Sequence, residues 1–359
     1  MEIFVATKAI ALTIATITFA GCIRDKEKKM DEIPPKIYVV GFETCGETMW
    51  SAPPAPTKYT GFIATMWSGG ESKRLADKDV HTEAEHIFAS NGDVYITGSM
   101  NSHKSRAMMW KNGEILPLEG NYEVRIKSLY VSGKDVYVTG NYFEGSAGDV
   151  FFGNEKRIGI LWRNGERTTF GNESEANGIH VLGKTVIVAG EKRRKAAIWI
   201  NGKITILDKN WSQANAVWIT EKKIYVVGTG GDYDNKPVIW VNGKKSILPL
   251  EKTKGEIIGE AQTVTVFGND VYVTGKVLIE NVGHELALWK NGIRQNISFP
   301  NLPNSIIQAI FIKNGEPYIL RRVWEKENDV EMIYVTKGDK AYKIADVKNG
   351  AGLHALFVE

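Results

Sequence analysis

The sequence has few cysteines and no excess of either charge. Its two cysteines among 359 residues exclude a disulfide-rich scaffold and a zinc site built on cysteines. The 45 basic and 42 acidic residues give a net charge of +3, and they form neither a basic stripe nor an acidic tail. This balance argues against nucleic acid as a partner.

Motifs that would mark a metal centre or a nucleophile are also missing. The six histidines form no His-x-x-x-His pair, and there is no Gly-x-Ser-x-Gly elbow. Residues 232–235 hold carboxylates at a spacing that calcium could use, but a turn is favoured because the glycine and distal glutamate of an EF-hand are absent. The basic run 192–195 is typical of a solvated hairpin tip. We predict no catalytic residues, no metal site and no cofactor.

The N-terminus has the pattern of a targeting segment. Residues 3–21 are small or apolar apart from a few threonines and Lys8, and they end in Phe19-Ala20-Gly21-Cys22. These four residues resemble the bacterial lipobox, which implies a signal peptide over 1–21 and a lipid on Cys22. An uncleaved membrane anchor is the alternative. Either way, the remainder is expected outside the cytoplasm, in the cell envelope and attached to the membrane.

The charged residues 22–35 predict a hydrated tether, since no core can form there.

The rest of the chain is built from three recurring phrases. The first is a β-branched run closed by glycine, as at 37–41, 94–98, 136–140, 186–190, 224–228 and 271–275, with a degraded copy at 317–320. The second is Trp-x-Asn-Gly, at 110–113, 162–165, 199–202, 240–243 and 289–292, with variants at 67–70 and 333–338. Asn-Gly between apolar runs predicts a type I′ hairpin turn.

The third phrase precedes each glycine-closed strand, and its position in the chain predicts how the fold closes. It occupies 84–89, 126–131, 176–181, 214–219, 261–266 and 307–312, and a seventh copy at 353–358 has no strand after it. The first unit lacks this strand, so the last strand is expected to complete the first sheet. Residues 36–359 therefore predict an all-β fold, a seven-bladed β-propeller of four-stranded antiparallel blades, with about 46 residues per blade. Six or eight blades, or an open solenoid, are the alternatives.

The Trp-x-Asn-Gly units resemble those of bacterial β-propeller lipoproteins over nearly the whole mature chain. This resemblance implies the fold and leaves the activity open.

One position in the third phrase is polar in all seven copies. The residues are Glu85, Lys127, Asn177, Asn215, Gln262, Gln308 and His354. Because these strands should surround the axis, the side chains are expected to form a polar ring at the mouth of the channel. Water is one partner for such a ring, and a ligand or ion is the other.

The connections expected on the face around that mouth vary in length and carry aromatic residues outside the repeat. They include Trp50, Tyr122, Tyr142, Phe143, Trp211, Tyr233 and Trp324. Exposed aromatics suit sugar rings or a protein partner, although each side chain could instead seal its own loop.

Two functional hypotheses follow. The first is a non-catalytic binding or scaffold lipoprotein that presents this face to a glycan, peptide or protein. The second is a propeller enzyme that acts on glycans, with Glu85 beside Lys127 and His354 at the mouth. We favour binding because a glycosidase usually needs two carboxylates and the ring has one acid.

Overall fold

The computed structural model describes residues 35–50, 57–77, 81–101, 106–120, 123–144, 156–231, 235–297, 300, 302, 304–325, 330–347 and 350–359. The predicted signal peptide, Cys22 and the tether up to residue 34 lie outside these residues. Within the described ranges, no helix is both long and apolar enough to cross a membrane.

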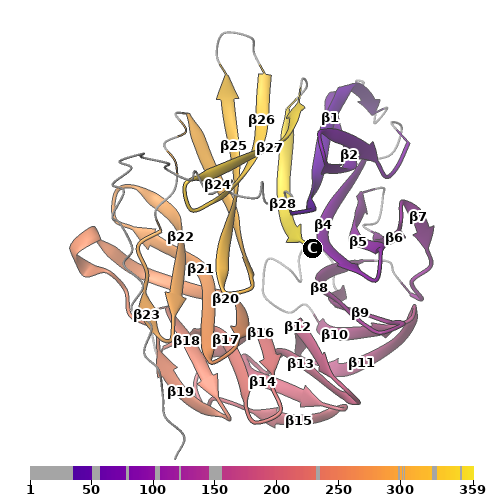
Figure 1. Ribbon diagram of the computed structural model, residues 1–359. Coiled ribbons are helices and arrows are strands. Elements are labelled where there is room, and N and C mark those ends of the chain that lie inside the picture. The colour runs from indigo at the N-terminus through magenta and orange to yellow at the C-terminus, as the bar shows by residue number, and fades with distance from the viewer. Residues whose placement is uncertain are drawn as a thin grey trace, which may run out of the picture. The chain divides into compact units, whose positions relative to one another are not determined.

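Residues 35–359 form a compact unit of seven four-stranded antiparallel sheets arranged as a seven-bladed β-propeller (Figure 1), which confirms the predicted fold class. Blade 1 comprises β28 (Ala351–Val358), β1 (Ile37–Trp50), β2 (Thr57–Ser68) and β3 (Glu71–Arg74). Blade 2 comprises β4 (His81–Ser90), β5 (Asp93–Asn101), β6 (Arg106–Lys111) and β7 (Glu114–Leu116). Blade 3 comprises β8 (Val124–Ser132), β9 (Asp135–Glu144), β10 (Lys156–Arg163) and β11 (Glu166–Asn172).

The remaining four blades repeat this order from the channel outward. Blade 4 comprises β12 (Ser174–Leu182), β13 (Thr185–Lys192), β14 (Lys195–Ile200) and β15 (Lys203–Ile206). Blade 5 comprises β16 (Ser212–Ile219), β17 (Ile224–Gly230), β18 (Lys236–Val241) and β19 (Lys244–Ile247). Blade 6 comprises β20 (Glu256–Phe267), β21 (Asp270–Ile279), β22 (Gly283–Lys290) and β23 (Ile293–Arg294), preceded by the 3-10 turn η1 (Lys252–Lys254). Blade 7 comprises β24 (Ser305–Lys313), β25 (Glu316–Glu325), β26 (Val330–Lys337) and β27 (Lys340–Val347).

The two ends of the propeller meet in blade 1. Strand β28 pairs with β1 from Ile37 opposite Val358 to Glu43 opposite Ala351, and Tyr38 lies opposite Phe357. Figure 1 shows these two strands side by side, β28 in yellow and β1 in indigo. The predicted closure by the C-terminal strand is confirmed, so no inner strand of the ring is left unpaired on this side.

The Asn-Gly pairs form the expected turns and also tie strands together. At Asn112-Gly113 the φ angles are 54° and 91°, as a type I′ turn requires. The Asn112 side-chain oxygen accepts from the Val94 backbone N–H at 2.8 Å, and its amide donates to Asp93 at 2.8 Å. The same acceptor bond recurs at the other four Trp-x-Asn-Gly turns. In blades 2 to 6, asparagine therefore connects the turn between the two outer strands to the turn between the two inner strands, on one face of the blade.

The tryptophans of the repeat fill the core between neighbouring blades. Trp67, Trp110, Trp162, Trp240 and Trp289 are fully buried, and Trp199 is 4% exposed. In one core cluster, Ile187 and Ala196 of blade 4 pack with Val226 and Trp240 of blade 5. Blade 7 has Thr336 at this position, also buried. A single blade cannot cover these surfaces, and contact between blades buries them.

Each innermost strand contains a β-bulge at the position of the predicted polar residue. The register against the second strand shifts at Glu85, Lys127, Asn177, Asn215, Gln262, Gln308 and His354. The bulge explains the glycine that closes the neighbouring strand. A Cβ on Gly190 would lie 1.8 Å from the Glu175 carbonyl oxygen, and one on Gly98 would lie 1.9 Å from that of Glu83. At these positions only glycine leaves room for the displaced carbonyl, whereas blade 7 has Arg321 at the equivalent position.

Candidate functional site

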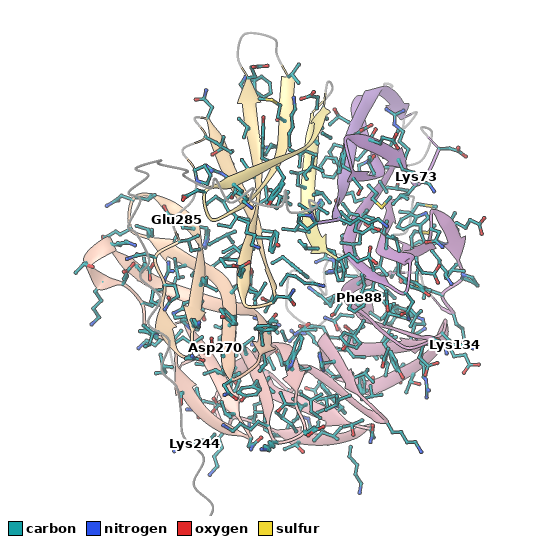
Figure 2. The ribbon with its side chains drawn as sticks, viewed as in Figure 1. Lys73, Phe88, Lys134, Lys244, Asp270 and Glu285 are labelled. Carbon is teal, nitrogen blue, oxygen red and sulfur yellow. The ribbon has the colours of Figure 1, made fainter. Side chains whose placement is uncertain are left out.

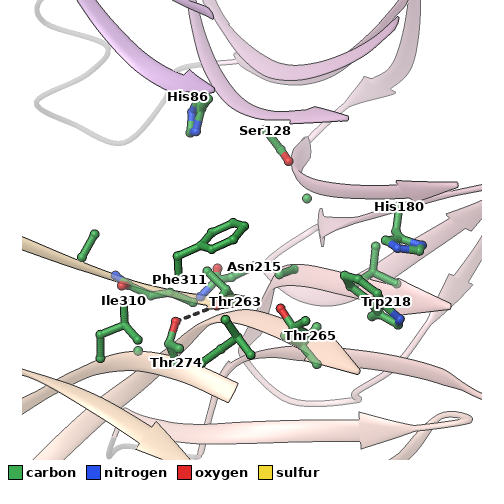
Figure 3. Close-up of a pocket in the computed structure, with 18 of the residues that line it drawn as sticks. His86, Ser128, His180, Asn215, Trp218, Thr263, Thr265, Thr274, Ile310 and Phe311 are labelled. Carbon is green, nitrogen blue, oxygen red and sulfur yellow. Dashed lines mark hydrogen bonds between the residues drawn. The ribbon is translucent and has the colours of Figure 1, made fainter. Parts of the chain in front are cut away.

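The innermost strands surround a cavity of about 1010 Å³. Six of the seven bulge residues line it, namely Lys127, Asn177, Asn215, Gln262, Gln308 and His354, whereas Glu85 is not part of the wall. In five blades the residue after the bulge also lines the cavity and is small: Ser128, Gly178, Ala216, Thr263 and Ala309. His86 is the large exception. The cavity therefore has a polar zone at the level of the bulges, where five blades contribute two consecutive residues to the wall and blades 1 and 2 contribute one each (Figure 3).

Some polar groups of this zone are fully engaged in joining blades. The Asn177 amide donates to the Ala214 carbonyl at 3.1 Å, and the Asn215 amide donates to the Ala261 carbonyl at 2.9 Å. Each bond connects one inner strand to the inner strand of the next blade. Asn177 also accepts from the Asn141 side chain at 3.1 Å. These two ring residues therefore have a structural role.

The other ring residues differ in how far they are engaged. Glu85 accepts from the Ser99 hydroxyl at 3.2 Å, and Gln262 donates to Glu260. His354 Nε2 lies 3.6 Å from a Glu83 carboxylate oxygen. The side chains of Lys127 and Gln308 form no hydrogen bond or ion pair with any other described residue. Their polar groups are available to a molecule in the cavity.

A second zone of the wall is aromatic. Three residues beyond each bulge stand Phe88, Tyr130, His180, Trp218, Phe311 and Phe357, all of which line the cavity. Ring centroids of successive members lie 4.2 to 5.3 Å apart from Phe311 through Phe357, Phe88, Tyr130 and His180 to Trp218. Blade 6 interrupts this aromatic belt with Thr265. Figures 2 and 3 show Phe88 on the inner side of the ring and Phe311 projecting into the cavity.

The aromatic belt was not recognised from the sequence, although a signal was present. Aligning the seven inner-strand phrases on their polar residue places an aromatic or imidazole ring three positions later in six of them. Within one phrase, such a residue looks like ordinary core.

Burial keeps the channel histidines neutral. Desolvation lowers the pKa of His180 to about 4. Desolvation also lowers the pKa of His86 to about 4, against a hydrogen bond with the Ile126 backbone and with help from Lys127. Burial likewise lowers the pKa of His354, and the neighbouring Glu83 opposes that shift. A neutral imidazole retains one acceptor nitrogen.

The acids near the mouth are bound to protein partners. Burial raises the pKa of Glu85, partly offset by the Ser99 hydrogen bond. Glu83 lies between His81, at 3.5 Å, and His354. Glu175 accepts from Arg157 at 2.6 Å and from Gln213 at 3.0 Å. Within the described ranges, no group of three or more histidine, cysteine or acidic residues could hold a metal ion.

The structure describes the side chains of four of the seven predicted loop aromatics, and they differ in exposure. Trp211 and Trp324 are exposed, at 44% and 42%, and Trp324 pairs with Glu331 in an extended hairpin. Tyr142 and Phe143 are half-buried in β9, beneath Arg167 and Arg125. Tyr122, Tyr233 and the side chain of Trp50 lie outside the described residues. In blade 6 the connection between the second and third strands is short, because β21 continues to Ile279 and β22 begins at Gly283.

Comparison with known proteins supports the fold alone. No family model matches the chain, and no curated protein does. Among solved structures, acylaminoacyl peptidase of Pyrococcus horikoshii is similar over 86% of this chain and 53% of its own, at 13% identity and a TM-score of 0.51. A structure from a study of two prolyl endopeptidases is similar over 87% of this chain and 50% of its own, at 12% identity and a TM-score of 0.49. The chain spans about half the length of these structures.

Proposed function

We propose that the protein is a non-catalytic binding lipoprotein of the cell envelope. Cys22 carries the lipid, residues 22–35 are the tether, and the propeller offers the variable face and channel mouth to a glycan, peptide or protein partner. The observation that carries the proposal is the cavity of about 1010 Å³, which combines unengaged polar groups with an aromatic wall. Ligand sites generally have this size and this mixture of lining groups.

The state of the carboxylates favours binding over glycan hydrolysis. A glycosidase holds one carboxyl group as acid and a second as base or nucleophile, both facing the substrate. Here Glu85 bonds to Ser99 and lies outside the cavity wall, while Glu175 is paired with Arg157. The carboxylates of Glu85 and Glu175 are therefore used in bonds within the protein, which favours a structural role for them.

The binding proposal is tested with the full-length protein on a glycan array and a peptide library. The mass of any bound ligand is measured before and after incubation. We expect binding without conversion, and we expect Trp218→Ala in the channel to weaken it about tenfold or more. Ile247→Ala, at an exposed position of the outermost strand β19, is the control. Absence of any ligand contradicts the proposal, as does conversion that Glu85→Gln abolishes in a folded variant.

The lipid anchor is tested separately by cell fractionation. Cys22→Ala is expected to release the protein from the membrane, and Cys45→Ala serves as the control for cysteine loss. Membrane association that survives Cys22→Ala would support the uncleaved anchor instead.

A further inference from the structure

The inner strand of blade 3 presents three polar side chains to the cavity within four residues. Lys127, Ser128 and Tyr130 all line the wall on β8. Lys127 is exposed to the channel, and among the described residues no carboxylate forms an ion pair with it. The nearby acid Glu85 is bound to Ser99. A positive charge at the mouth is therefore left for a ligand.

The hydrogen bonds of His180 fix the direction in which the Tyr130 hydroxyl donates. His180 Nδ1 accepts from the Ile219 backbone N–H at 3.5 Å. Nδ1 therefore carries no proton, and the proton of the neutral ring is on Nε2. Nε2 lies 3.3 Å from the Tyr130 hydroxyl, so the imidazole donates and the tyrosine oxygen accepts. The Tyr130 O–H hydrogen is then free to donate to an acceptor in the cavity.

The apolar part of the site lies next to these donors. Phe88 is in edge contact with Tyr130, with ring centroids 5.1 Å apart, and Phe357 and Phe311 continue the aromatic belt. A group that accepts from Lys127 and Tyr130 would thus have an aromatic surface beside it. Carboxylates prefer ammonium and hydroxyl donors, and aromatic rings accommodate large apolar groups.

A second cavity adjoins the first and provides room for a chain. Its volume is about 520 Å³, and it shares Lys276, Leu286 and Gln308 with the main cavity. A single amino acid would not need this space, whereas the preceding residues of a peptide would extend into it.

We propose that the channel binds the C-terminal residue of a peptide, with its free carboxylate on Lys127 and Tyr130 and its aromatic or large aliphatic side chain against the belt. This inference rests on the proposed binding function and specifies its ligand.

The test measures binding of four probes to the full-length protein by isothermal titration calorimetry. The probes are a pentapeptide ending in phenylalanine, its C-terminal amide, the same peptide ending in alanine, and N-acetyl-phenylalanine. We expect the phenylalanine acid to bind at least about tenfold more tightly than the amide or the alanine peptide. N-acetyl-phenylalanine is expected to bind more weakly than the pentapeptide. Equal binding of N-acetyl-phenylalanine would assign the site to a small aromatic acid and overturn the peptide proposal.

Two variants with matched controls locate the carboxylate. Lys127→Gln and Tyr130→Phe should each weaken the acid about five- to tenfold and leave the amide unchanged. Two controls should leave the binding of both the acid and the amide unchanged. One is Lys134→Gln, in the exposed turn after β8. The other is Tyr95→Phe, since the Tyr95 hydroxyl donates to Asp93 at 3.4 Å. Thermal unfolding checks that every variant is folded.

Equal affinity for acid and amide, unchanged binding in both variants, or no binding of any probe would overturn the proposal. If the arrays meanwhile yield a ligand without a carboxylate, the binding function stands and only this assignment fails.

Discussion

Blades 4 and 7 have the same strand order and the same bulge but use different residues at four equivalent positions. Blade 4 has Trp199, Gly190, His180 and Asn177, and blade 7 has Thr336, Arg321, Phe311 and Gln308. Strand β12 is buried along nearly its whole length, whereas most residues of β24 are partly exposed. The strand order and the bulge are therefore retained in both blades, whereas the side chains that pack one blade against the next can differ between blades.

The largest difference is expected at the core position. Trp199→Ala should lower the free energy of unfolding by about 3 to 5 kcal/mol, because it leaves a large cavity between blades. Thr336→Ala removes one methyl group and a hydroxyl that has no partner among the described residues, and it should cost about 1 kcal/mol. Urea unfolding followed by circular dichroism measures both. Equal losses would show that blade 7 depends on its core as much as blade 4 does.

The glycine position should separate the two blades next. Gly190→Ala forces a Cβ to within 1.8 Å of the Glu175 carbonyl and should cost about 3 kcal/mol. In blade 7, Arg321 already places a Cβ there, and its guanidinium donates to Pro300 O at 2.7 Å and to Ser305. Arg321→Ala should cost about 1 to 2 kcal/mol, from lost hydrogen bonds alone. The same urea titration tests this, and an undisturbed Gly190→Ala would refute the glycine argument.

A pH titration should distinguish His180 from Phe311. The pKa of His180 is about 4 in the folded protein against an ordinary value of 6.5, so the unfolded chain binds more protons between these values. Stability is therefore full above pH 6.5 and falls as the pH drops toward 4, by up to about 3 kcal/mol. His180→Gln should flatten this fall, whereas Phe311→Leu should not. His86 contributes in the same direction, so part of the slope remains in either variant.

The smallest difference is expected at the bulge residues. Asn177→Ala removes the bond to the Ala214 carbonyl and should cost about 1 to 2 kcal/mol. Gln308→Ala should change stability by less than about 0.5 kcal/mol, because the described residues offer Gln308 no partner. Thermal unfolding resolves a difference of this size. A large loss at Gln308 would mean that it also joins blades.

The sequence was sufficient to predict the blade number, the closure and the turns, because each depends on local chemistry repeated seven times. The polar position within the inner strand could also be found, since it breaks an apolar phrase. Its cause, the bulge, could not be found, because an extra residue in a strand is defined only against its partner. Asn177 bonds to the next blade, whereas the Lys127 side chain remains available to a ligand. This difference depends on distances between blades, which no local sequence pattern encodes.

The pairing of β28 with β1 also has a consequence for biosynthesis. Because the partner of β1 is β28, which follows all the other blades in the sequence, the inner edge of the first blade stays open until β28 has been synthesised. Six blades can assemble earlier, and the ring is closed only when β28 pairs. A chain that lacks β28 would keep an exposed strand edge, which is prone to aggregation and open to proteolysis.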